Sequence, residues 1–303
     1  MASPAEKAPA AIQKDNVEGS TILPYKRESS SQTDEEDAKR SRIVSPFDDL
    51  NIDDDTILHK VTTRNLCPQC NKMMKYFCYR CFCTVGMDRS EIPFIKLPVH
   101  LDVIKHEQEL DGKSTAIHSR VIANEDVDIH LWRNMPEFES PERTLLLFPG
   151  PDAKQLKDIP RDAFDRVAVI DGTWKQAKKI VRETPALQKF QKVTIAPRKT
   201  YFWRYQQLSE NHLATIEAIY YFYKEYEEAY ENSRGRYDNL LFFYRFFYNL
   251  IQEKYRSGTK EFCHRHRQGY IQYDASSDQK QQEDTKGSAK EEPKTSGESK
   301  SPE

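Results

Sequence analysis

Five cysteines gather within one short segment of the sequence. Two Cys-x2-Cys pairs, Cys67 with Cys70 and Cys78 with Cys81, are separated by seven residues, and Cys83 follows them. Two such pairs can place four thiolates tetrahedrally around one Zn²⁺. We therefore predict a structural zinc ion held by Cys67, Cys70, Cys78 and Cys81, with Cys83 as the substitute ligand. The alternative is a set of buried free thiols.

A second candidate for chemistry is the acidic residue Asp171, which follows an apolar run. Residues 166–170 read as a buried strand that ends at Asp171-Gly172, and a helix over 174–183 is expected next. Ligands of open parallel sheets bind beyond the carboxyl ends of the strands. Asp171 could therefore act as a general base or hold an amine. The alternative is a helix cap, a role that Thr173 could also fill.

Another apolar run, 144–148, ends at the breakers Pro149-Gly150-Pro151, where the backbone could approach a ligand closely. Neither strand end carries a G-x-G-x-x-G or a G-x4-G-K-[ST] pattern, and the sequence has no G-x-S-x-G elbow. Nicotinamide-dinucleotide, nucleoside-triphosphate and serine-hydrolase chemistry therefore receive no support.

The elements that must position these residues alternate along the chain. Strands are expected at 94–104, 144–148, 166–170 and 192–195, and helices at 114–124, 174–183, 212–230 and 238–256. Continuous apolar strands that alternate with helices favour an α/β fold, in which a mostly parallel sheet carries helices on both faces.

The charge and the aromatic residues are unevenly distributed. Residues 1–60 hold 8 basic and 13 acidic side chains, residues 274–303 hold 5 and 8, and the middle of the chain therefore carries a net +6. Only Tyr25 and Phe47 among the 34 aromatic residues lie outside the middle. We expect disordered tails at 1–60 and 274–303, a cysteine-rich segment at 61–93 and the main domain at 94–273.

The sequence also bears on where in the cell the protein acts. No apolar stretch has the length of a membrane helix and no secretory h-region opens the chain, so a reducing compartment is expected. Lys26-Arg27 and the cluster 39–42 resemble a bipartite nuclear import signal, which predicts the nucleus, and the cytoplasm as well. The alternative is a solvated tail.

Basic and aromatic side chains alternate in the middle of the chain, a pattern typical of RNA contacts. A basic run of this kind is usually only a soluble surface. Several such runs in a positively charged core favour RNA binding by Lys175, Lys178, Lys179, Arg198, Lys199, Trp203 and Arg204.

Several motifs together resemble one family. Asp171-Gly172-Thr173-Trp174 matches the D-x-T-W signature of the DTW-domain family, and Phe148–Pro151 resembles its strand-end loop. The segment 199–204 resembles its basic-aromatic segment, and 213–222 resembles its S-T-x-E-A helix, with Ala214 where Ser is usual. With the cysteines upstream, the resemblance covers about residues 67–255. The stretches 111–118 and 237–244 resemble in particular a eukaryotic member that modifies tRNA uridine.

The resemblance implies a SPOUT-like domain with a knotted C-terminal part that holds S-adenosylmethionine. It also implies transfer of the 3-amino-3-carboxypropyl group from S-adenosylmethionine to N3 of a tRNA uridine in the D-loop. The product would be 3-(3-amino-3-carboxypropyl)uridine. The expected partners are tRNA and S-adenosylmethionine, with no membrane and no obligate protein partner.

Site residues follow from the same resemblance. The catalytic candidates are Asp171, Thr173 and Trp174. The candidates for binding S-adenosylmethionine are Phe148, Pro149, Gly150, Asp171, Gly172, Thr215 and Glu217. Asp171 would remove the N3 proton or bind the amino group of the transferred chain, and Trp174 would stack on a base or pack in the core. Glu217 would face the site or lie on a solvated helix face. Two rival functions remain: a zinc-ribbon RNA-binding protein without catalysis, and a SPOUT-like RNA methyltransferase.

Overall fold

A six-stranded parallel sheet forms the centre of the molecule. The structure, a computed structural model, describes residues 45–204 and 211–259. The strand order is β6-β5-β9-β7-β10-β8, and each neighbouring pair is parallel. The strands are β5 (His100–Lys105), β6 (Val127–Leu131), β7 (Thr144–Leu147), β8 (Lys154–Gln155), β9 (Arg166–Asp171) and β10 (Gln191–Thr194).

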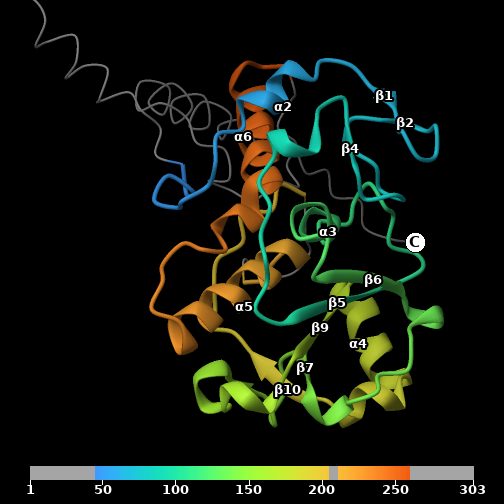
Figure 1. The fold of residues 1–303 in the computed structure, drawn as a ribbon, viewed down its shortest axis with the longest axis vertical. Coiled ribbons are helices and arrows are strands. Elements are labelled where there is room, and N and C mark those ends of the chain that lie inside the picture. Colours follow the sequence, from blue (N-terminus) through green and yellow to red (C-terminus); the bar gives the residue numbers. More distant parts are fainter. Residues whose placement is uncertain (1–44, 205–210, 260–303) are drawn as a thin grey trace, which may run out of the picture. The chain divides into compact units, whose positions relative to one another are not determined.

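Helices cover the sheet on both faces, because alternate residues of each strand point to opposite sides. Val167 and Val169 of β9 join a core with α3 (Ile117–Ile122), α5 (Thr215–Tyr230) and α6 (Phe242–Arg256). Ala168 and Ile170 pack on the other face against α4 (Trp174–Glu183) (Figure 1). The predicted α/β fold class is therefore confirmed, whereas the knot stays a prediction. The short 3-10 helices span Arg89–Glu91, Trp132–Asn134, Pro141–Arg143, Leu156–Asp158, Arg161–Ala163, Pro185–Lys189 and Asp238–Leu241.

The strand expected at 94–104 is shorter than predicted, since β5 begins only at His100. The backbone N–H groups of Ile95 and Leu97 donate to Ile122 O (3.3 Å) and to an Asp126 carboxylate oxygen (2.8 Å) instead of to a neighbouring strand. Pro98 has no N–H to donate. A carbonyl oxygen at the end of α3 and a side-chain carboxylate therefore replace the strand ladder over 94–99.

Strand β6 was not predicted, because its residues do not form an apolar run. Its His130 contacts Asp102 of β5 (2.9 Å), which is fully buried and also accepts two hydrogen bonds from Arg166 of β9 (2.9 and 2.8 Å). Burial alone would raise the pKa of Asp102, but the bonds from His130 and Arg166 outweigh it and hold that pKa below its usual value. These partners compensate a charge that would otherwise be costly to bury.

Residues 45–60 are folded, which corrects the expectation of a disordered tail over 1–60. Phe47 is only 3% exposed and packs edge-on against Tyr248 of α6, with ring centroids 5.2 Å apart. Helix α2 (Thr56–Lys60) buries Leu58, and Arg245 of α6 forms an ion pair with Asp55 (3.1 Å). Phe47, Leu58 and the Asp55–Arg245 ion pair together fix this segment against the core and α6.

Other parts of the predicted tails lie outside the described residues. These are the basic clusters at 26–42, which suggested nuclear import, and the stretch 274–303. Among the described residues, no helix combines the length and the apolar character needed to cross a membrane.

Candidate functional site

A cavity of about 970 Å³ opens where the carboxyl ends of β5 and β9 meet the first turn of α5. Its volume is in the range of small-molecule sites. Its position agrees with the rule that ligands bind beyond the carboxyl ends of parallel strands. The cavity is lined by Glu109, Lys113, Thr115, Asp171, Gly172, Thr173, Trp174, Lys175, Lys178, Phe202, Arg204, His212, Leu213, Ala214 and Thr215.

Asp171 is held at the base of this cavity by residues from two other elements. Ser114 Oγ donates to one carboxylate oxygen (2.7 Å), and Thr215 Oγ1, in the first turn of α5, donates to the other (2.6 Å). The residue is 2% exposed, and burial raises the pKa of its carboxyl, against the two hydroxyls and Lys105, which lower it. Asp171 therefore does not cap α4. Its carboxylate is a fixed group at the meeting point of β9, α5 and the loop after β5.

Thr173 is the N-cap residue of α4, which confirms the capping role that the sequence offered as one possibility for it. Its hydroxyl accepts a hydrogen bond from the Gln176 N–H (3.4 Å), and the Gln176 side chain accepts one from the Thr173 N–H (2.7 Å). Gly172 has φ of +156°, and a Cβ atom there would approach His106 Cβ to 3.3 Å and Gln176 Oε1 to 3.0 Å. A glycine is thus needed for the tight passage from β9 into α4.

Trp174 is half-buried and stands on the wall of the cavity. Its ring lies 5.2 Å from that of His212 and 6.0 Å from that of Phe148. Phe148, Pro149 and Gly150, predicted to bind the cofactor directly, do not line the cavity. Phe148 instead contacts the ring of Trp174. The loop after β7 therefore acts indirectly, because its Phe148 packs against Trp174, which lines the cavity.

Glu217 is also placed differently from the prediction, although Thr215 of the same turn lines the cavity. Its carboxylate is 2% exposed and does not line the cavity. It accepts hydrogen bonds from Thr200 Oγ1 (2.6 Å), the Tyr201 N–H (2.8 Å) and the Ala214 N–H (2.7 Å). Burial raises the pKa of Glu217, and these bonds oppose the rise. The group fixes the segment before Phe202 and Arg204 against α5, so the alternative of a solvated helix face is wrong too.

Three of the seven predicted RNA-binding residues lie on the cavity wall. Lys175 and Lys178 are exposed on the first turns of α4. Arg204 donates to the carbonyl oxygens of Lys113 (2.8 Å) and Gly112 (2.9 Å), so it ties the basic-aromatic segment to the loop after β5.

The other four have different surroundings. Lys179 is exposed, lies over the ring of Trp132 and does not line the cavity. Arg198 pairs with Glu225 (3.6 Å), and Lys199 is exposed. Trp203 packs against Tyr244, with centroids 5.1 Å apart, so it belongs to the core's aromatic contacts.

Sequence reasoning missed the part of the cavity that the loop after β5 supplies. Glu109 lies in a polar stretch with no binding motif, and Lys113, Ser114 and Thr115 lie in the stretch 111–118, whose resemblance to the family assigned them no role. The cavity wall His212 was missed for the same reason. Burial raises the pKa of Glu109, and the nearby negative charge of Asp171 raises it further. The signal that links these residues is spatial, because only the fold brings the ends of β5 and β9 together.

The cysteine-rich segment forms two small antiparallel strand pairs beside the main domain. These are β1 (Asn65–Leu66) with β2 (Met73–Met74), and β3 (Tyr76–Phe77) with β4 (Thr84–Val85). Each Cys-x2-Cys pair is followed by a residue with positive φ, Asn71 (55°) and Phe82 (57°). Both pairs therefore turn back sharply on themselves, and their backbone bonds are alike: Asn71 N–H to Cys67 O and Phe82 N–H to Cys78 O, each 3.0 Å.

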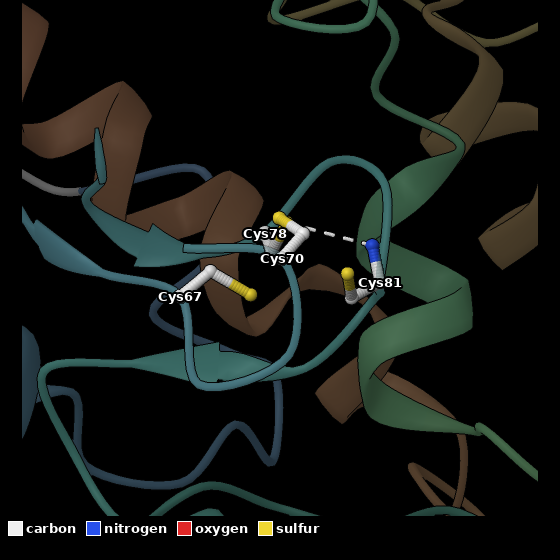
Figure 2. A group of neighbouring side chains, drawn as sticks. All are labelled: Cys67, Cys70, Cys78 and Cys81. Atoms are coloured by element: carbon white, nitrogen blue, oxygen red, sulfur yellow. Dashed lines mark hydrogen bonds between the residues drawn. The ribbon is translucent and has the colours of Figure 1, made fainter. Parts of the chain in front are cut away.

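The Sγ atoms of Cys67, Cys70, Cys78 and Cys81 all lie within 4.8 Å of one another (Figure 2). Four thiolates around zinc, with Zn–S of about 2.3 Å, stand about 3.8 Å apart, and the Cys70 and Cys78 sulfurs are 3.6 Å apart. The Cys81 N–H also points to Cys78 Sγ (3.4 Å). Cys83 lies beyond the second turn, with its Sγ 3.6 Å from that of Cys67. The donor set of four fits a tetrahedral zinc ion.

Comparison with known proteins identifies the relatives of this chain. The family model of the DTW domain matches residues 75–252. The tRNA-uridine aminocarboxypropyltransferase 1 of Xenopus tropicalis is 34% identical over 243 residues, which cover 65% of this chain and 82% of that protein. The proteins of the same name from Rattus norvegicus and Homo sapiens are 34% and 33% identical, each over 71% of this chain and over 86% and 87% of their own lengths. No solved structure matches the chain. The chain belongs to the DTW domain family.

Proposed function

We propose that this protein is a tRNA-uridine aminocarboxypropyltransferase. It would transfer the 3-amino-3-carboxypropyl group of S-adenosylmethionine to N3 of a tRNA uridine in the D-loop. The observation that carries the proposal is the buried carboxylate of Asp171 at the base of a cavity of about 970 Å³, in a chain whose relatives bear that name. A protein that only binds RNA needs no such cavity.

The cavity suits a cationic donor that contains a nucleoside. Asp171 supplies a carboxylate that two hydroxyl groups hold in place, and in its ionised form it would attract the sulfonium or the amino group of S-adenosylmethionine. Trp174 and Phe202 supply aromatic faces for adenine or uracil. The sulfonium activates three attached carbons, so the pose that the cavity imposes decides which of them the uridine attacks.

The rim of the cavity suits an RNA backbone. Lys175, Lys178 and Arg204 carry positive charge beside the opening, where phosphates of a tRNA loop would pass. The zinc site of Cys67, Cys70, Cys78 and Cys81 would be structural, because it offers four sulfur ligands and no open position. We further propose that the protein acts in the nucleus, on the strength of the basic clusters at 26–42.

The decisive experiment is a reaction of the purified protein with unmodified tRNA and S-adenosylmethionine, followed by nucleoside mass analysis. We expect 3-(3-amino-3-carboxypropyl)uridine and 5′-methylthioadenosine. A methylated nucleoside with S-adenosylhomocysteine would instead assign a methyltransferase, and absence of any product would leave an RNA-binding protein.

Two variants sharpen the assay. Asp171→Asn keeps the size of the side chain but removes its charge, so product formation should be lost while the protein stays folded. Asp152→Asn is the matched control, since Asp152 is an exposed carboxylate that pairs with Lys192 (2.9 Å) away from the cavity lining. Full activity of Asp171→Asn would refute a role for this charge.

A further inference from the structure

The cavity contains two carboxylates that are held very differently. Each oxygen of Asp171 accepts a hydroxyl hydrogen bond, and the residue is 2% exposed. Glu109 is half-buried in the cavity wall, and no hydrogen bond or ion pair within the described residues involves its carboxylate. The carboxylate of Asp171 is therefore fixed by its two hydrogen bonds, whereas that of Glu109 is available to bind a ligand.

Two of the three cations around Glu109 are engaged with other partners. Lys105 Nζ is bound to Asp111 (2.5 Å), and the Arg204 guanidinium donates to the carbonyl oxygens of Lys113 and Gly112. Lys105, Lys113 and Arg204 lower the pKa of Glu109, but burial and the charge of Asp171 outweigh them and raise it. A carboxylate with a raised pKa is a better proton acceptor near neutral pH.

The reaction proposed above needs a proton acceptor. Uridine N3 is an imide nitrogen that carries a hydrogen, and it attacks carbon best as its anion. The acceptor must come within hydrogen-bond distance of that hydrogen. Asp171 already uses both of its oxygens at the buried base of the cavity, whereas Glu109 stands on a turn in which its N–H donates to His106 O (3.0 Å), with its side chain on the wall.

We propose that Glu109 is the general base for uridine N3, and that Asp171 acts as a fixed charge that positions the donor. The assignment rests on the proposed function. The N3 proton passes to a carboxylate oxygen of Glu109, and the N3 electron pair forms the bond to Cγ of the methionine part of S-adenosylmethionine. The Cγ–S bond breaks with its electron pair left on sulfur, which gives neutral 5′-methylthioadenosine. Glu109 then returns its proton to water.

The test compares Glu109→Gln with Glu107→Gln, a matched change in the same loop at an exposed residue outside the cavity lining. The Glu109→Gln variant should lose about 10²–10⁴-fold in single-turnover rate. Its affinity for S-adenosylmethionine, measured by calorimetry, its affinity for tRNA and its melting temperature should equal those of the wild type. Glu107→Gln should resemble the wild type in every measurement.

A pH series and a substrate change separate a base from a structural residue. The wild-type rate should level off above the pKa of the base, whereas the Glu109→Gln rate should keep rising in proportion to hydroxide concentration. A tRNA that contains 5-fluorouridine has a more acidic N3–H, so it should restore much of the lost rate in Glu109→Gln. Glu109→Asp, which withdraws the carboxylate, should be slower than wild type with the wild-type form of pH profile.

The outcomes distinguish this assignment from the proposed function. If the wild type makes the product and Glu109→Gln is equally fast, or if its deficit is a loss of donor binding, Glu109 is not the base and the function stands. The same holds if 5-fluorouridine gives no rescue. If the wild type makes no product from tRNA and S-adenosylmethionine, both the proposed function and this assignment fall.

Discussion

His118 is expected to make the fold sensitive to mild acid. The residue is 4% exposed and lies among aromatic rings, with centroids 5.6 Å from Phe77, 5.9 Å from Phe243 and 5.7 Å from Phe247. Its Nδ1 has no hydrogen-bond partner within the part of the chain that the structure describes. Burial, helped by the charge of Arg204, lowers its pKa from 6.5 to about 3. The folded protein therefore holds His118 neutral where the unfolded chain would protonate it.

The size of the effect follows from proton linkage. Because the folded pKa is depressed, the stability from His118 is complete above the unfolded value of 6.5 and is lost as the pH falls toward about 3. The slope is about 1.4 kcal/mol per pH unit, so His118 alone should cost about 2 kcal/mol between about pH 7.5 and pH 5.

Urea unfolding at those two pH values measures this cost. His118→Leu should lose about 2 kcal/mol less than the wild type over the same interval. Phe243→Leu is the control, since it disturbs the same cluster without removing a titrating group, and its loss with pH should equal that of the wild type. Protonation of the cysteine ligands is common to all three proteins and cancels in the comparison. Equal losses in the wild type and His118→Leu would refute the reasoning.

Three further predictions concern the other parts of the structure. Cys78→Ser should abolish stoichiometric zinc binding and lower the melting temperature, whereas Cys83→Ser should keep the metal. Elemental analysis and thermal unfolding measure both effects. Loss of the metal in Cys83→Ser alone would show that Cys83 is a ligand. Phe47→Ala should destabilise the fold by about 3–5 kcal/mol in urea, and no change would mean that its segment is not part of the core. Lys178→Ala should weaken tRNA binding and reduce the salt slope of log affinity by about one unit, and an unchanged slope would remove Lys178 from the phosphate contacts.

Elements with strong local signals could be predicted from the sequence. The run Arg166–Ile170 forms β9, and the capped segment that starts at Thr173 forms α4, because apolar continuity and capping are properties of neighbouring residues. Strand β6 lacks apolar continuity and shows only a short alternation of apolar and polar residues over Val127–Leu131. Its Asp128 and His130 are tolerated in a sheet because partners on β5 and elsewhere neutralise them, and those partners are distant in sequence.

The residues of the candidate site also divide into those with a local sequence signal and those without one. Asp171 could be found at the end of a predicted strand, and the cysteine pairs by their spacing. Glu109 could not be found, because it lies in a polar loop and is brought beside Asp171 only when β5 pairs with β9. Glu217 could be identified but not correctly placed: its position on α5 does not reveal that Thr200 and Tyr201 turn it away from the cavity.

The contacts between residues 45–60 and α6 determine where this domain can be cut. All the hydrogen bonds that the structure gives the Arg245 guanidinium go to Ile52, Asp53 and Asp55. The match to the family model begins at residue 75. A fragment that starts there would leave the Arg245 guanidinium without these partners and would expose the ring of Tyr248. Such a fragment would aggregate or melt early, and its inactivity would say nothing about the residues that carry out the reaction.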